Sequence, residues 1–359
     1  MHRFFFILLF LFNFFYLQGQ TKFGFEVGSK LGVLSPHRPV IRHLPRELVK
    51  GGELSFFKVV AGNKEWHNIY KLPKIGLTLY YSNLGNDDVL GNALGMTSWI
   101  QFRFIQKQHH HFGLNLRLGI GHISKPFDLN LNPQNIAISS HWNCLAIGGI
   151  QYQYVWDKLS IGTRLDLTHF SNAAFIAPNL GLNIIQSSIA LNYLFSKNKL
   201  QLNLTKTPIN TEHVINKNSL IILGFIGQKQ IFNHLGQNFK IQGGTLAYQH
   251  LFSLPVGIEI GFDLMKNASD IKILEDKGLI VNSVFKSGTY LGYVLTLDKL
   301  HFIVAMGHYL RDQFNLNDKL YHRIGLRYIF LDRFLINCTL KSHWGNADYL
   351  ELGLGMRFG

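Results

Sequence analysis

The sequence LSIGTRLDLTHFS, residues 159–171, decides the fold class because its side chains alternate in polarity with a period of two. Its apolar residues fall on one side of an extended strand, whereas Arg164 and Asp166 fall on the other. His169 and Ser171 lie on the apolar side. In a soluble sheet that side would bury two polar groups at a cost in free energy. In a membrane barrel it is the lipid-facing wall, and the charged side faces a wet lumen.

A second alternating segment, residues 183–195, follows the loop residues 178–181, so the two segments are expected to pair as a hairpin. Asn183 then lies at the same end and on the same face as His169 and Ser171. A serine, a histidine and a side-chain amide are the parts of a serine hydrolase: a nucleophile, a general base, and a group that orients the base.

The sequences HFSNA (residues 169–173) and PNLGLN (residues 178–183) resemble the H-x-S-N…P-N-x-G-x-E pattern of the PagL-type outer-membrane lipid A 3-O-deacylases. This chain has Asn183 where that family has its catalytic glutamate. An asparagine twelve residues after Ser171 resembles instead the triad of the outer-membrane phospholipase A. The Ser-Asn-Gly-Arg continuation of the phospholipase is absent, however, so the P-N-x-G spacing favours the deacylase.

The resemblance to the deacylases implies a role for each residue of the motif. His169 is the general base, Ser171 is the nucleophile that attacks an ester carbonyl, and Asn183 is the candidate orienter of the base. Backbone amides of the loop, with one asparagine side chain, would stabilise the oxyanion. The predicted oxyanion or substrate-binding residues are Asn172, Asn179 and Gly181. No metal site and no cofactor are predicted, and a dependence on calcium is left open.

The composition supports a membrane barrel. Aromatic residues make up 13% of the chain and charged residues 16%, below the roughly 25% charged residues of ordinary soluble domains. Residues 1–20 read as a secretory signal, with Arg3 before an apolar run that is too short to span a bilayer. No later stretch is a continuous apolar twenty-mer. The prediction is an all-β, transmembrane antiparallel β-barrel of the outer-membrane type.

The barrel is expected to occupy residues 21–359, with the motif in the half 21–196 and a degenerate half in 197–359. About 12–16 strands are predicted, with one or two of them in the region 197–228. The other strand candidates are residues 22–34, 53–61, 74–82, 93–106, 112–124, 140–155, 159–171, 183–196, 239–252, 255–265, 284–297, 301–311, 320–331, 334–343 and 349–358. The polar segments 206–217 and 267–278 are expected to be loops or a short plug.

The second half repeats the motif in altered form. The sequence HWGNA, residues 343–347, echoes residues 169–173, with Gly345 in place of the nucleophile. His343 falls on the polar side of its strand and is expected to face the lumen. We interpret the chain as a duplicated arrangement of hairpins in which only the first copy has a functional site. A chance match within a glycine-rich barrel is the alternative.

The connections indicate where the site lies. Long segments such as 125–139 and 172–182 alternate with short ones such as 107–111 and 156–158, with 62–73 as the exception. Because outer-membrane barrels carry their long loops outside the cell, the motif is placed at the outer leaflet, where lipid A lies. Cys144 is expected to be a small lipid-facing residue, as is Cys338, and the two are not expected to form a disulfide.

The charge bears on the partners. A formal net charge of +14 suits a surface of lipid phosphates. The alternative is a basic surface that contacts only water and has no binding role. Nucleic acid is a poor candidate because the basic residues are scattered. The expected substrate is lipid A of lipopolysaccharide. A phospholipase acting on glycerophospholipids and a non-catalytic barrel or channel are the alternatives. The acyl position and the oligomeric state are left open.

Overall fold

The computed structural model describes residues 22–60, 64–195, 217–252, 255–281, 283–312, 316 and 318–359. The predicted secretory signal lies outside the described residues, as does nearly all of the predicted loop 206–217. Neither α2 (Glu65–Ile69) nor α3 (Ala268–Asp276) is long and apolar enough to cross a membrane, and no other helix in the described part of the chain is.

The first eight strands form a closed antiparallel barrel, in which β8 pairs back with β1. The 3-10 helix η1 (Pro39–Ile41) lies in the connection from β1 to β2, and α2 lies in the next one. The strands are β1 (Lys22–Leu34), β2 (Val49–Val59), β3 (Lys74–Asn83), β4 (Asn92–Lys107), β5 (His110–Ile123), β6 (Trp142–Trp156), β7 (Leu159–Ser171) and β8 (Leu182–Leu194).

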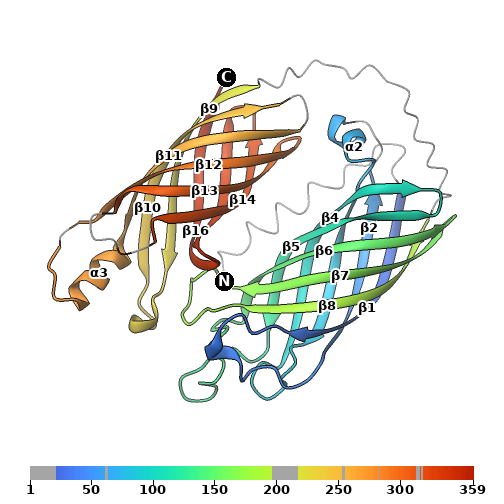
Figure 1. The fold of residues 1–359 in the computed structure, drawn as a ribbon, viewed down its shortest axis with the longest axis horizontal. Helices are drawn as coiled ribbons and strands as arrows, with labels where there is room; N and C mark the ends of the chain where they lie inside the picture. Colours follow the sequence, from blue (N-terminus) through green and yellow to red (C-terminus); the bar gives the residue numbers. More distant parts are fainter. Residues whose placement is uncertain are drawn as a thin grey trace. The chain divides into compact units, whose positions relative to one another are not determined.

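The other eight strands form a second closed antiparallel barrel, in which β16 pairs with β9. Figure 1 shows each set of strands wrapped into its own closed sheet. The 3-10 helix η2 (Phe232–His234) follows the first of these strands, and α3 follows the third. The strands are β9 (Asn218–Lys229), β10 (Phe239–Leu251), β11 (Val256–Asn267), β12 (Phe285–Leu297), β13 (Leu300–Asp312), β14 (Leu320–Phe330), β15 (Phe334–His343) and β16 (Asn346–Phe358).

The all-β barrel class is confirmed, and each predicted strand overlaps an observed one. The described strands number sixteen, but they close into two barrels of eight, which differs from the single large barrel that the sequence led us to expect. The contacts divide the chain accordingly into two units, and they group the loop Asn172–Leu180 with the second unit. The polar segment 267–278 contains the helix α3.

The two faces of β7 are those predicted. Leu165 and Leu167 are half-exposed on the outer wall, whereas Arg164 and Asp166 are buried inside the barrel. Exposed apolar side chains recur at alternate positions on most of the strands, which is the surface pattern of a barrel surrounded by lipid. Of the two cysteines, Cys144 is exposed and the other is half-buried, and the two do not form a disulfide, as predicted.

Much of the interior of the first barrel is filled by paired charges. Lys30 Nζ lies 2.7 Å from Asp166 Oδ2, and Arg117 Nη1 lies 2.9 Å from Glu53 Oε2. Arg164 also contacts Glu53 and lies within 2.7 Å of Glu26. Eight strands enclose a space just wide enough for their own side chains. The expectation that Asp166 lines a wet lumen is therefore wrong, because it was based on a wider barrel.

The second barrel has an interior of the same kind. Arg327 Nη1 lies 2.6 Å from Glu259 Oε2, and Arg323 lies 3.1 Å from Asp263 and 2.8 Å from Glu351. Buried tyrosines, including Tyr290, Tyr321 and Tyr349, pack among these charges. Each of these arginines thus has a carboxylate partner, which offsets much of the free energy that burial of a charge costs.

The filled interiors predict that the protein does not conduct ions. Purified protein reconstituted in a planar bilayer should give no stable single-channel current, because the paired side chains occupy the lumen of each barrel. A general porin serves as the positive control. A reproducible ohmic conductance that scales with the amount of inserted protein would contradict this prediction and would favour the channel alternative.

Candidate active site

The register of β7 and β8 brings two of the predicted site residues together. His169 stands directly opposite Asn183 in the antiparallel pair. The imidazole Nδ1 lies 2.6 Å from the amide Oδ1. An amide oxygen can only accept a hydrogen bond, so Nδ1 carries the proton and Nε2 carries the lone pair. That tautomer is the one that a general base needs to remove a proton from a serine.

The predicted nucleophile is the last residue of β7. Ser171 lies two positions beyond His169, so both side chains project from the same face of the strand. It stands opposite Cys144 of β6, on the outward side, and is only 7% exposed. The serine and the imidazole therefore share one patch of the outer wall, at the end of the barrel where the long loops begin.

Gly181 makes room for the imidazole. Its φ is +80°, and a Cβ atom built on it would lie 2.8 Å from His169 Cε1 and 3.2 Å from the carbonyl oxygen of Phe170. Its own N–H group donates to the carbonyl oxygen of Ala137 over 2.9 Å. This N–H group therefore already has an acceptor and does not point to an oxyanion. The absence of a side chain at Gly181 leaves space for the ring of His169.

The close approach predicts a loss of turnover for Gly181→Ala. The added methyl group would displace the His169 ring, and the positive φ adds about 1 kcal/mol of backbone strain. We expect folded protein with kcat lowered about tenfold or more, measured as ester hydrolysis. Gly236→Ala is the matched control, because Gly236 has φ +82° but no atom within 4 Å of its built Cβ. Equal activity of the two variants would contradict the prediction.

The loop between β7 and β8 holds two further predicted residues together. The N–H group of Asn172 donates to Asn179 Oδ1 over 3.1 Å. The Asn172 side chain donates in turn to the carbonyl oxygen of Ile176 over 2.9 Å. The left-handed backbone of Ala173 (φ 55°) and Ala174 (φ 63°) turns the chain sharply after the strand. The amide of Asn179 therefore has a fixed orientation, with its oxygen toward the residue that follows Ser171.

His37 is a site residue that the sequence analysis missed. It lies in the connection from β1 to β2, and its Nδ1 is 3.1 Å from Asn183 Nδ2. The N–H group of Ser35 donates to the backbone oxygen of Asn183 over 2.7 Å, which ties this connection to β8. The amide of Asn183 therefore contacts a histidine at each end. A barrel of sixteen strands would not have placed β1 beside β8, so no sequence signal indicated the contact.

The second copy of the motif has a different environment. His343 Nε2 lies 3.2 Å from the hydroxyl of Tyr309, and Nδ1 lies 3.7 Å from a carboxylate oxygen of Asp348. These partners belong to the interior of the second barrel, where the sequence predicted that His343 would point. Gly345 has φ +83° and offers no hydroxyl group. The pair of residues that the first barrel presents on its outer wall thus has no counterpart here.

Comparisons with known proteins agree with the division into two barrels. Residues 50–192 match the family model described as lipid A 3-O-deacylase, PagL. Residues 218–359 match the model described as acyloxyacyl hydrolase, C-terminal domain. No curated protein matches the sequence. The matched ranges lie in the first barrel and in the second barrel, respectively.

Solved structures of outer-membrane barrels are also similar to the chain, at low identity. The Pseudomonas putida toluene transporter TodX is 9% identical, with 95% of this chain and 89% of that chain covered and a TM-score of 0.18. A porin refined at 1.8 Å is 8% identical, with 94% and 100% covered and a TM-score of 0.17. At these values the transported compounds have no bearing on the present chain.

Proposed function

Because this chain belongs to the lipid A 3-O-deacylase family of outer-membrane carboxylic ester hydrolases, we propose that Ser171, His169 and Asn183 hydrolyse an ester-linked acyl chain of lipid A. One observation supports this assignment above the others. The 2.6 Å hydrogen bond to Asn183 holds the imidazole in the tautomer of a general base, on the same face as the serine. The proposed substrate reaches that face from the membrane.

The reaction follows from these positions. His169 Nε2 takes the proton of the Ser171 hydroxyl as Oγ attacks the ester carbonyl, and a tetrahedral oxyanion forms. The intermediate collapses as the imidazolium returns the proton to the departing sugar oxygen, which leaves as an alcohol. The acyl group remains on Ser171 as an ester. A water molecule, deprotonated by His169, then releases the fatty acid and restores the serine.

The oxyanion would be stabilised from the loop after β7. Asn179 Oδ1 already accepts the N–H group of Asn172, so the NH₂ group is the end of that side chain suited to donate. A neutral amide donor of this kind contributes about 10²–10³-fold to turnover in hydrolases that use one. We assign the stabilisation of the oxyanion to Asn179. Asn172 fixes the orientation of the Asn179 side chain, and Gly181 leaves space for His169.

His37 is proposed as a positioning residue. An asparagine, unlike the family glutamate, presents an oxygen at one end and an NH₂ group at the other, so it can orient the base only when its oxygen faces His169. The Nδ1 atom of His37 accepts from the NH₂ group and thereby selects that orientation. The pair Asn183 and His37 would together replace the carboxylate.

The substrate would enter from the outer leaflet. Leu165 and Leu167 share the face of the proposed site and are half-exposed, whereas the lumen is filled by paired charges. The connection 124–141 and the loop 172–181 are long at this end. At the other end the turns 108–109 and 157–158 are short, with the connection 60–73 as the exception. Outer-membrane barrels carry their long loops outside the cell, where lipid A forms the leaflet.

Mass spectrometry of outer-membrane lipids, with and without the protein, tests the substrate. Lipid A should lose one ester-linked acyl chain when the protein is present, and phospholipids should keep both of theirs. The asparagine of the proposed triad makes a phospholipase the second candidate. Accumulation of lysophospholipids with intact lipid A would replace the first assignment by the second.

A further inference from the structure

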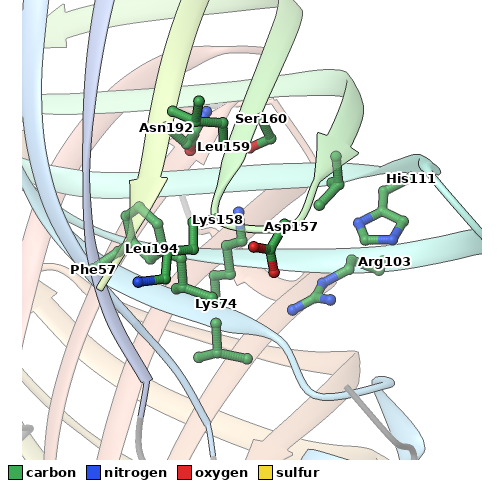
Figure 2. A pocket seen from close by; sticks show the side chains of 12 residues that line it. Phe57, Lys74, Arg103, His111, Asp157, Lys158, Leu159, Ser160, Asn192 and Leu194 are labelled. Carbon is green, nitrogen blue, oxygen red and sulfur yellow. The ribbon is translucent and has the colours of Figure 1, made fainter. Parts of the chain in front are cut away.

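A pocket lies at the end of the first barrel that is opposite to His169 and Ser171. Figure 2 shows its lining side chains, which come from β2 to β8 and from the short turn between β6 and β7. The charged and titratable members are Lys74, Arg103, His111, Asp157 and Lys158. Three cations and one imidazole thus face a single carboxylate, and that carboxylate lies on the exposed turn.

The buried cations of the pocket, Arg103 and Lys74, differ from those elsewhere in the lumen, because neither forms a direct ion pair with a carboxylate of the described residues. Arg103 is 3% exposed and Lys74 is 8% exposed. Arg103 Nη2 donates to the backbone oxygen of Leu72 over 2.7 Å, but its Nε has no partner. Lys74 Nζ contacts only the amide oxygen of Gln153, at 3.2 Å, and the ring of Phe57. Within the described residues, no carboxylate oxygen lies within 4.0 Å of either group.

Buried cations without a counter-charge are costly. Lys30, Arg117 and Arg164 in the same lumen each contact a carboxylate, so the fold pairs other interior charges of this barrel. A buried charge left unpaired is strongly destabilising, and a bound ion or water is one explanation for an unsatisfied buried donor. The arrangement therefore indicates an anion that enters the pocket from outside the barrel.

We propose that a phosphate oxyanion binds at the mouth of this pocket, whose enclosed volume of about 20 Å³ admits only part of the anion. The guanidinium of Arg103 offers a planar fork of donors that suits two phosphate oxygens, and Lys74 adds a point charge. His111, only 5% exposed, and Lys158 at the rim supply donors from two further directions. The anion is either free inorganic phosphate or the phosphodiester of a phospholipid head group. The proposal is independent of the ester hydrolysis assigned to the other end of the barrel.

Titration of the purified, detergent-solubilised protein with inorganic phosphate tests the pocket. Saturable binding is expected for the wild type, with affinity lowered at least tenfold in Arg103→Gln and in Lys158→Gln. Lys107→Gln is the matched control, because Lys107 is an exposed cation on the same strand as Arg103 and is not part of the lining. Phosphate should also raise the Tm of the wild type and of Lys107→Gln, but not that of Arg103→Gln.

A second titration, with short-chain dihexanoyl phosphatidylglycerol, identifies the source of the anion. Competition between this lipid and inorganic phosphate would assign the pocket to a lipid head group, and binding of inorganic phosphate alone would assign it to the free ion. If Arg103→Gln does not fold, the phosphate affinity of the rim variant Lys158→Gln is compared with that of the wild type instead. Absence of saturable binding of both probes to the wild type would overturn the proposal, as would unchanged affinity in the folded variants.

Discussion

Ser171→Ala is expected to lower ester hydrolysis by about 10⁴-fold or more, because the attacking oxygen is lost while the barrel keeps its fold. The serine terminates β7, and the change removes a single oxygen atom without altering the backbone pairing of the strand. Release of fatty acid from lipid A by purified protein measures the effect. Heat-modifiable migration in gel electrophoresis reports the fold.

Ser187→Ala is the matched control for this variant. Ser187 is also an outward-facing serine of the first barrel, on β8 opposite Leu165 and away from the site. Its removal should leave turnover unchanged. Wild-type turnover in Ser171→Ala would eliminate this serine as the nucleophile, and equal losses in both variants would indicate a general effect of altering the outer wall.

Asn183→Ala is expected to lower kcat about 10²-fold or more with little change in KM, because the histidine loses the oxygen that fixes its tautomer. Asn183→Glu should retain activity, since a carboxylate accepts the same hydrogen bond with either oxygen. Steady-state kinetics on lipid A distinguish the two parameters. If Asn183→Ala matched the wild type, the base would have a different orienter.

His37 should matter only while residue 183 is an asparagine. We expect His37→Phe to lower kcat about tenfold in the wild-type background, which corresponds to about 1.4 kcal/mol. In the Asn183→Glu background the same change should have little effect, because a carboxylate needs no partner to select its oxygen. This double-mutant cycle isolates the coupling of the two residues.

The histidine cycle has a control in the same connection. His43 is an exposed histidine whose Nε2 contacts the backbone oxygen of Gln134, and it lies apart from the site. His43→Phe should leave kcat unchanged in both backgrounds. A loss for His37→Phe that is the same in both backgrounds would show a structural role for His37 and would contradict the positioning role.

The alternation of side chains allowed the strands to be predicted from the sequence. The bounds of β7 agree with the predicted ones, and Arg164 and Asp166 lie inside the barrel while Leu165 lies outside. A period of two determines the faces of a strand. The contact of His169 with Asn183 followed from the same pattern, because adjacent strands joined by a loop pair in antiparallel register.

The closure of the sheet could not be read from the alternation. A strand of given polarity pairs equally well with many others, so nothing in β8 indicated that its far neighbour is β1. The structural consequences of that pairing could therefore not be predicted from the sequence. They include the interior that Lys30 and Glu53 fill and the contact of His37 with Asn183. The pocket around Arg103 escaped notice for the same reason, since its members come from strands far apart in the sequence.

The pairing of β1 with β8 also determines when the proposed site is completed. His169 and Asn183 meet as soon as one hairpin forms, but His37 follows β1 and reaches them only when the first and last strands of the barrel join. Until these two strands have joined, the barrel is not closed. A chain whose first and last strands have not yet paired has Ser171 and His169 in place, but it lacks the contact of His37 with Asn183. Hydrolysis of membrane lipids would thus reach its full rate only in molecules that have finished assembling.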